Sequence, residues 1–149
     1  MPVFTIAYRS RSLIAERMSD SDAEMERLLR QSRARNRRLG ITGALLFNDC
    51  RFVQILEGDE TAVLTLLDDI KRDTRHTDID VLAPRVLPGR SFADWSMAFI
   101  GSASAGGIDA FSLGRQFDWT RATSDLLAAL ILELISATAA TIPRDGASH

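Results

Sequence analysis

Cysteine, histidine and lysine are all scarce in this chain of 149 residues, and the first two scarcities exclude classes of site. The one cysteine, Cys50, has no partner for an internal disulfide and cannot build a cysteine-based metal cage. The two histidines, His76 and His149, are too few for a histidine-rich metal site. The sequence therefore predicts a protein without a metal centre.

Long hydrophobic runs are missing as well. No apolar segment reaches the about 18 residues that a membrane-spanning helix needs, and Met1–Thr5 lacks the pattern of a signal peptide. The hydrophobic fraction of 46% is nevertheless enough for one compact domain with a buried core. We therefore expect a cytoplasmic domain that does not associate with a membrane.

Basic charge is almost entirely arginine, because Lys71 is the only lysine. Six arginines fall between Arg27 and Arg38, which allows a nucleic-acid surface as one interpretation. Glu24 and Glu26 adjoin this cluster, however, and the net charge of the chain is -2. The pattern favours a solvated helix face, and we expect no nucleic-acid partner.

The predicted secondary structure consists of short strands and amphipathic helices. Alternating apolar and polar positions indicate half-buried strands, and one-sided apolar spacing indicates helices, with Gly40 as a stop signal. The expected elements are strand Val3–Tyr8, helix Ser21–Arg38, strands Thr42–Phe47 and Arg51–Glu57 as a hairpin, a helix from about Ala62 to Arg72, strands Ile79–Val86 and Trp95–Ile100, and helix Thr123–Thr138.

This order, β-α-β-β-α-β-β followed by a helix, predicts an α+β fold of the ferredoxin-like type. Two helices would cover one face of an antiparallel-rich sheet. The apolar C-terminal helix would cover the other face, which carries Val53 and Ile55. We expect the sheet domain over residues 1–100, and a linker with a C-terminal helical extension over residues 101–149.

Polar side chains occupy several positions where this fold expects apolar ones. Tyr8, the only tyrosine, ends the first strand, Gln54 is an amide in mid-strand, and Asn36 and Ser32 continue the apolar stripe of the first helix. Singly, each has an ordinary explanation as an amphipathic core residue, an exposed strand residue or a helix terminator. Together they would converge beneath the helix pair, which indicates a small-molecule pocket.

Four separate segments, in the right order, resemble the BLUF family of blue-light photoreceptors. They are Ser32–Gly43, Phe52–Gly58, Asp73–His76 and Phe92–Met97, and Tyr8-Arg9-Ser10 fits the start of the family. The resemblance covers about residues 1–100. It implies a sensor, not an enzyme, that holds a flavin between the two helices and signals through the hydrogen bonds of Tyr8 and Gln54.

The resemblance also implies roles for individual residues. Tyr8 would donate an electron to the excited flavin, Gln54 would relay a hydrogen bond to the flavin N5/O4 edge, and Trp95 and Met97 would lie near Gln54 and change environment on illumination. The flavin would be held by Tyr8, Leu28, Ser32, Asn36, Gln54, Ile70, Asp73, Arg75 and His76, with Ser10 as a further hydroxyl. FAD is the expected cofactor, with FMN or riboflavin as alternatives at the same ring site.

Two positions depart from the family pattern. Arg35 stands where relatives often carry Asn or His, and Asp69 stands where an arginine can face the flavin in relatives, so the exact ring contacts are open. Because only the helical extension follows the last strand, the signal would pass to a separate protein. A homodimer or higher homo-oligomer through the apolar C-terminal helix is also expected.

Other classes of function are compatible with parts of the sequence. A ferredoxin-like enzyme of the acyl-phosphate hydrolase type would use Arg and Asn, and a plain interaction module would bind no ligand. Asn48–Gln54 is also similar to the cysteine motif of LOV domains, in which a thiol adds to the flavin. In this chain, however, Asp49 is inserted and Cys50 falls in the predicted hairpin turn.

Overall fold

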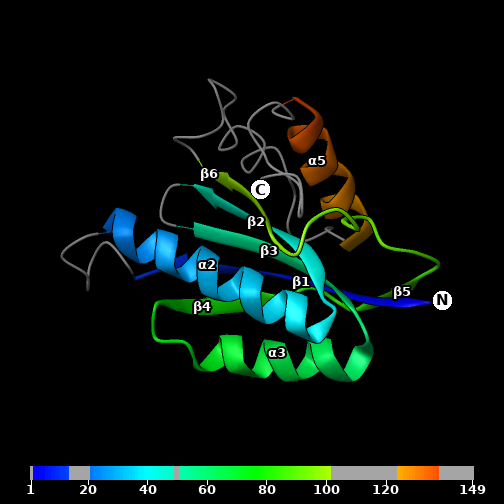
Figure 1. Cartoon of the computed structure of the whole chain (residues 1–149), viewed down its shortest axis with the longest axis horizontal. Helices are drawn as coiled ribbons and strands as arrows, with labels where there is room; N and C mark the ends of the chain where they lie inside the picture. The colour runs from blue at the N-terminus through cyan, green and yellow to red at the C-terminus, as the bar shows by residue number, and fades with distance from the viewer. Residues whose placement is uncertain (1, 14–20, 49–50, 102–123, 138–149) are drawn as a thin grey trace.

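The computed structural model describes residues 2–13, 21–48, 51–101 and 124–137. Its elements are β1 (Val3–Ser12), α2 (Ser21–Leu39), β2 (Thr42–Asn48), β3 (Arg51–Gly58), α3 (Glu60–Arg72), β4 (His76–Val81), β5 (Arg85–Leu87), β6 (Ala98–Gly101) and α5 (Ser124–Ala137). The predicted ferredoxin-like α+β fold is confirmed, with helices on both faces of one sheet (Figure 1). Among these described helices, none is long and apolar enough to cross a membrane.

The sheet has six strands in the order β4-β1-β3-β2-β6, and β5 also pairs with β1. All pairs are antiparallel except the parallel pair of β2 and β6. The register places Tyr8 opposite Gln54 and Ile6 opposite Leu56, so that side chains at these positions share one face. The prediction that the first and third strands are adjacent is confirmed.

Two predicted strands differ in the structure. The expected strand Ile79–Val86 is divided into β4 and β5, with Pro84 between them, and proline has no N–H to donate to a ladder. The last strand begins at Ala98 instead of Trp95. The preceding residues, Trp95–Met97, therefore form an irregular segment that leads into the sheet.

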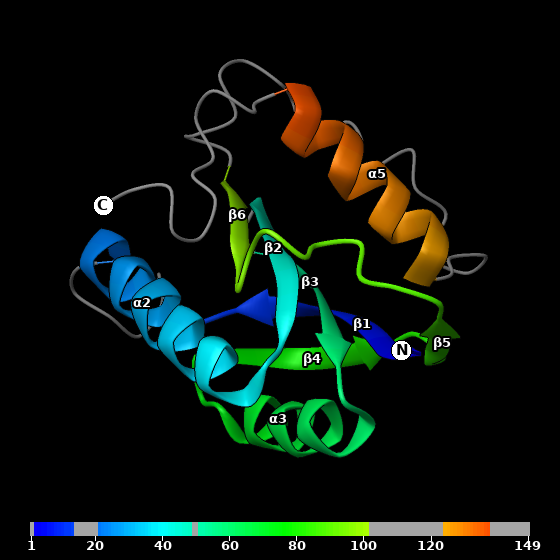
Figure 2. The ribbon, with the colours of Figure 1, turned by 45° about the vertical axis from the view of Figure 1, so that its right-hand side comes forward.

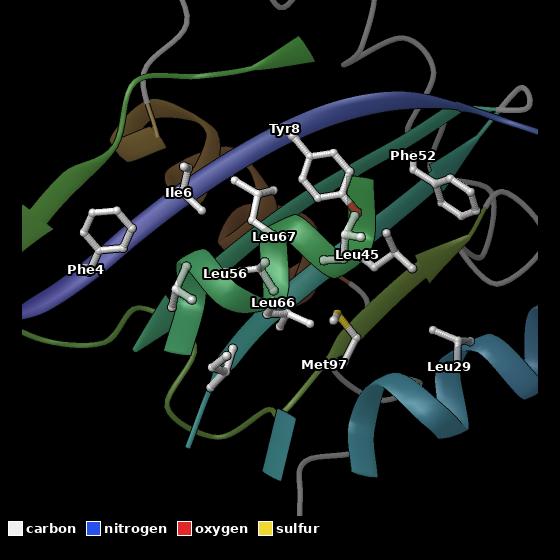
Figure 3. Packing of buried hydrophobic residues seen from close by; sticks show 13 residues of the cluster. Phe4, Ile6, Tyr8, Leu29, Leu45, Phe52, Leu56, Leu66, Leu67 and Met97 are labelled. Carbon is white, nitrogen blue, oxygen red and sulfur yellow. The ribbon is translucent and has the colours of Figure 1, made fainter. Parts of the chain in front are cut away.

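The helix pair α2 and α3 packs on one face of the sheet (Figures 1 and 2). Leu29 of α2 and Leu66 and Leu67 of α3 join the side chains of β1, β2 and β3 in one buried cluster (Figure 3). Helix α2 ends where the sequence predicts, because Gly40 adopts a φ of 69° and the N–H of Ile41 donates to the carbonyl of Asn36 at 2.8 Å. This ending fixes the face that α2 turns toward the sheet.

Helix α5 covers the opposite face (Figure 2). Its residues Leu127, Ile131 and Ile135 form a second buried cluster with Ala7 and Ile55 of the sheet. The predicted cover for this face is thus confirmed. The division of domains at residue 100 and the oligomer stay predictions, and the predicted linker, Cys50 and His149 lie outside the described residues.

Gly43 in β2 is placed where no side chain would fit. A Cβ there would lie 2.1 Å from the carbonyl oxygen of Ile55, and the N–H of Gly43 donates to the carbonyl of Trp95 at 3.1 Å. The hydrogen bond from Gly43 attaches the segment Trp95–Met97 to β2, the strand that pairs with β3.

Candidate functional site

Tyr8 and Gln54 meet on the sheet face beneath α2 and α3. They are opposed in the β1–β3 register, and each side chain is only 4% exposed. The phenol O–H of Tyr8 donates a hydrogen bond to Oε1 of Gln54. The convergence of these two polar side chains, predicted from strand alternation, is confirmed.

The other end of the Gln54 amide faces Met97. Nε2 of Gln54 donates to the sulfur of Met97 at 3.5 Å, and Met97 is 1% exposed. An amide carries both donors and an acceptor, so Gln54 accepts from the phenol with one end and donates to the thioether with the other. Figure 3 shows Tyr8 and Met97 pointing into the same layer as Leu45.

Burial raises the pKa of Tyr8 above its ordinary value of about 10. The positive charge of Arg35 opposes this rise, and the negative charge of Asp73 adds to it. The phenol is therefore neutral at physiological pH, which is the form that can donate to Gln54.

A pocket opens between the helix pair and the sheet beside Tyr8 and Gln54. Its empty volume is about 430 Å³ counted to its open mouth. It is lined by Tyr8, Leu28, Ser32, Arg35, Leu45, Phe52, Gln54, Ile70, Asp73, Arg75 and His76. Eight of the nine predicted cofactor-binding residues are in this lining, and the ninth, Asn36, lies next to Arg35 on the same helix.

Asn36 is completely buried yet only half satisfied. Its Nδ2 donates to the carbonyl of Ser96 at 2.7 Å, whereas its Oδ1 is buried without a partner in the described structure. An unsatisfied buried acceptor costs roughly 1–3 kcal/mol. A ligand with an N–H group at its rim, such as the pyrimidine part of a flavin, fits this vacant acceptor.

Asp73 and Arg75 form the polar end of the pocket. Arg75 donates to Asp73 from its backbone N–H at 2.9 Å and from Nη2 at 2.6 Å, and it also pairs with Glu24 of α2 at 3.6 Å. Burial alone would raise the pKa of Asp73, but the hydrogen bonds and charge of Arg75 outweigh it and hold this pKa below its ordinary value. The pair is therefore a mutually neutralised unit.

His76 is fixed in orientation by two contacts. Its Nε2 lies 2.6 Å from the carbonyl of Ile70, and its Nδ1 lies 2.7 Å from the hydroxyl of Ser10. Because a carbonyl only accepts, Nε2 carries the proton of this contact. The imidazole ring thus connects the end of α3 to β1 at the edge of the pocket.

Comparison with known proteins agrees with this arrangement of fold and pocket. The family model described as "Sensors of blue-light using FAD" matches residues 3–98. The chain belongs to the BLUF family. It is a BLUF blue-light photoreceptor of the flavin-binding type, and the match gives no support to a LOV domain, an acyl-phosphate hydrolase or a plain interaction module.

Solved BLUF structures resemble the chain over most of its length. The dark-state structure of the BLUF protein BlrB has a TM-score of 0.73 and 32% sequence identity, and the match covers 90% of this chain and 96% of BlrB. The ground state of BlsA has a TM-score of 0.72 and 28% identity, with 91% of this chain and 88% of BlsA covered.

Curated relatives are matched only in part. The blue light- and temperature-regulated antirepressor BluF of Escherichia coli strain K12 is 33% identical over 93 residues, which are 62% of this chain and 22% of BluF. Photoactivated adenylate cyclase subunit beta of Euglena longa is 35% identical over 78 residues, 52% of this chain and 9% of that protein. The match thus spans a minor part of either relative.

Trp95 does not lie where the BLUF resemblance implied. It was expected near Gln54 together with Met97, but its side chain joins the cluster on the opposite sheet face with Phe92, Leu127 and Ile131. The resemblance implied this position for both residues, and the predicted strand Trp95–Ile100 would also have placed Trp95 and Met97 on one side. The segment is not a strand until Ala98, so the alternation does not apply there.

Three pocket residues were not among the predicted flavin contacts. In the sequence, Arg35 stands out only as a departure from the family pattern. Leu45 pairs with Gln54 in the β2–β3 register, and Phe52 is two positions before Gln54 on the same strand face. The hairpin register alone would have found both apolar residues. Within the described ranges, no three His, Cys, Asp or Glu side chains are grouped to hold a metal ion.

Proposed function

We propose that this chain holds FAD in the pocket between α2 and α3 and signals blue light through Tyr8, Gln54 and Met97, without turning over a substrate. The observation that carries the proposal is the continuous path of buried contacts from the Tyr8 phenol, through the Gln54 amide, to the Met97 sulfur. Tyr8 and Gln54 line the pocket, so a ring ligand would touch the middle member of this path, and Met97 lies behind it.

The flavin, when bound, absorbs blue light and becomes a strong acceptor of one electron. Tyr8 is the donor in this proposal, because a phenol is readily oxidised and its O–H proton already points at Oε1 of Gln54. When Tyr8 loses an electron, its phenol proton becomes strongly acidic, and Gln54 is the acceptor within reach. Proton movement would then be coupled to the electron transfer.

Gln54 is the residue that converts this event into a lasting change. Rotation of its amide, or a shift of its proton to give the imidic tautomer, exchanges the donor and acceptor ends. Rotation turns Nε2 away from the sulfur of Met97 and ends their contact, whereas the imidic form leaves Nε2 with one hydrogen instead of two. A new hydrogen bond toward the flavin O4 would shift the absorption to the red.

Other residues of the pocket would hold the ring in place. Leu28 of α2 and Ile70 of α3 would pack on its two faces, and Asn36 would accept from its pyrimidine N–H through the free Oδ1. Ser32, together with Asp73, Arg75 and His76, would contact the polar edge and side chain. FMN or riboflavin would use the same ring contacts.

The signal would leave through the segment Trp95–Met97. This segment is attached to α2, since Asn36 donates to the carbonyl of Ser96 and Arg33 donates to the carbonyl of Met97 at 3.1 Å. A change at Gln54 would therefore move β6 and α2 together. The relation to the antirepressor BluF supports a separate protein as the receiver of the signal. A homo-oligomer through the outer face of α5 is also proposed, because Leu126 is exposed on that face.

The purified full chain provides the test. We expect it to be yellow from bound flavin, to shift its absorption to the red under blue light, and to recover in the dark. Tyr8→Phe should keep the flavin and lose the shift, because the ring remains and the donor O–H is gone. A colourless protein, or a normal photocycle in Tyr8→Phe, would contradict the proposal.

A further inference from the structure

Arg35 is a charged member of the pocket wall with no partner among the described residues. It lines the pocket from α2, next to the buried Asn36. Its Nε–H is buried without a hydrogen-bond acceptor in the part of the chain that the structure describes. Burying a charge without a partner is unfavourable. An anionic group of a ligand bound in the pocket would supply the partner that the described residues do not.

The other charges around the pocket are already engaged. Arg75 is neutralised by Asp73 at 2.6 Å and approached by Glu24 at 3.6 Å. Asp69, on the neighbouring turn of α3, pairs with Arg72 at 3.3 Å and is exposed to solvent. Asp69 and Asp73 act on Arg35 through their negative charges, but among the described pocket residues no carboxylate forms an ion pair with it.

The charge of Arg35 acts inside the photoactive site. Burial lowers the pKa of Arg35 and the negative charges of Asp69 and Asp73 oppose this, so the arginine stays protonated at any physiological pH. The positive charge of Arg35 lowers the pKa of Tyr8. The field of Arg35 therefore extends to the point where the ring of a ligand would lie against Tyr8 and Gln54.

We propose that Arg35 makes the pocket bind reduced, anionic flavin more tightly than oxidised flavin, and so raises the reduction potential of the bound cofactor. This inference rests on the proposed function. The oxidised ring is neutral, whereas the reduced ring readily carries a negative charge on its pyrimidine side. A fixed cation at the ring favours the reduced form, and by linkage this preference is equivalent to a higher potential.

The negative group that Arg35 meets has two sources in a flavin nucleotide. It is either the reduced ring or the phosphate of the side chain, and an arginine suits both. Riboflavin has the ring and no phosphate, so it separates them. An effect of Arg35 that appears with riboflavin belongs to the ring, and one that appears only with FMN belongs to the phosphate.

The experiment measures the dissociation constants of oxidised and dithionite-reduced riboflavin and FMN, under anaerobic conditions, for four forms of the full chain. These are the wild type, Arg35→Gln, Arg35→Lys and the control Arg38→Gln, which removes an exposed arginine of the same helix. For Arg35→Gln we expect the preference for reduced riboflavin to fall by about tenfold, which corresponds to about 30 mV for a two-electron couple. Arg35→Lys should keep most of the preference, and Arg38→Gln all of it.

A second measurement needs no flavin. Because Arg35 is an unpaired, partly buried charge, the neutral amide of Arg35→Gln should leave the thermal midpoint of the flavin-free chain unchanged or higher. A clear decrease would show that Arg35 stabilises the fold instead and would overturn the inference. An unchanged riboflavin preference in Arg35→Gln, or an effect confined to FMN, would overturn it too. If the wild type binds neither flavin, the proposed function itself fails.

Discussion

The buried carboxylate of Glu57 on β3 accepts a hydrogen bond of 2.6 Å from the backbone N–H of Phe92. It also accepts from the N–H of Ser91 and from the hydroxyl of Thr42, each at 2.8 Å. Glu57 is 0% exposed, so these three donors satisfy a charge that water does not reach. The segment that leads to Trp95–Met97 is thereby attached to the strand that carries Gln54.

Glu57→Gln should lower the free energy of unfolding by about 1–3 kcal/mol, because an amide has one acceptor oxygen and leaves a buried donor unsatisfied. Urea unfolding monitored by circular dichroism measures the loss. Asp68→Asn removes an exposed carboxylate from α3 and serves as the control, with an expected change within about 0.5 kcal/mol. Equal stability of the two variants would contradict the role given to Glu57.

Met97 and Trp95 lie on opposite sheet faces. Substituting Met97 should therefore mainly affect the light-induced red shift, and substituting Trp95 should mainly affect stability. Met97→Leu keeps the volume and should cost less than about 1.5 kcal/mol of stability, but it removes the sulfur that faces Nε2 of Gln54. We expect a changed size or recovery rate of the light-induced red shift. Trp95→Phe alters the cluster beneath α5 and should reduce stability while leaving the red shift closer to that of the wild type.

Difference spectra before and after blue light, together with urea unfolding curves, measure both properties for each variant. If Trp95→Phe changed the red shift as strongly as Met97→Leu does, then Trp95 would have to reach Gln54 in the working protein. The opposite-face arrangement would then not describe the signalling state.

The sequence predicted the central part of the fold because that part depends on local patterns of apolar and polar residues along single strands and helices. Alternation in β1 and β3 set the shared face of Tyr8 and Gln54, and the α2 stripe placed Asn36 against the sheet. The partner of Asn36, the carbonyl of Ser96, was not predictable, because it depends on how an irregular segment crosses the helix. The same holds for Trp95, because the residues before Ala98 are not a strand and a period of two does not describe them.

Charge pairing in the pocket was also beyond the sequence. Asp73 and Arg75 are both expected at the flavin, and the structure shows in addition that they pair with each other. Whether an arginine is compensated depends on side chains from several elements, and only their three-dimensional arrangement shows that Arg75 is paired with Asp73 and Arg35 is not.

The Asp73–Arg75 pair should make the stability depend on acidic pH. The pKa of Asp73 is lower in the folded chain than in the unfolded one, so folding favours the charged carboxylate. Its contribution is fully present above the unfolded pKa of about 3.9 and is lost as the pH falls through the lower folded pKa. Asp73→Asn should therefore be less stable than the wild type at neutral pH, and the difference should shrink in strong acid. A difference independent of pH would contradict the ion pair.

Tyr8 should produce the opposite dependence at alkaline pH. Burial raises its pKa, so the folded chain keeps the phenol proton where the unfolded chain has lost it. Stability from this group is complete below the unfolded pKa of about 10 and decreases as the pH rises above it. Because Tyr8 is the only tyrosine, the ultraviolet absorbance of tyrosinate reports on this one group.

The titration can be followed in the flavin-free chain against Tyr8→Phe as a blank. We expect tyrosinate to appear in the folded protein only well above the pH at which a free tyrosine ionises, or abruptly when the chain unfolds. Arg35→Gln should delay it further, since it removes the positive charge that lowers the pKa of Tyr8. Ionisation at the ordinary pH of a free tyrosine, with the fold intact, would show that the phenol is open to solvent. A solvent-exposed phenol could not be the buried donor to Gln54 on which the proposed signalling path depends.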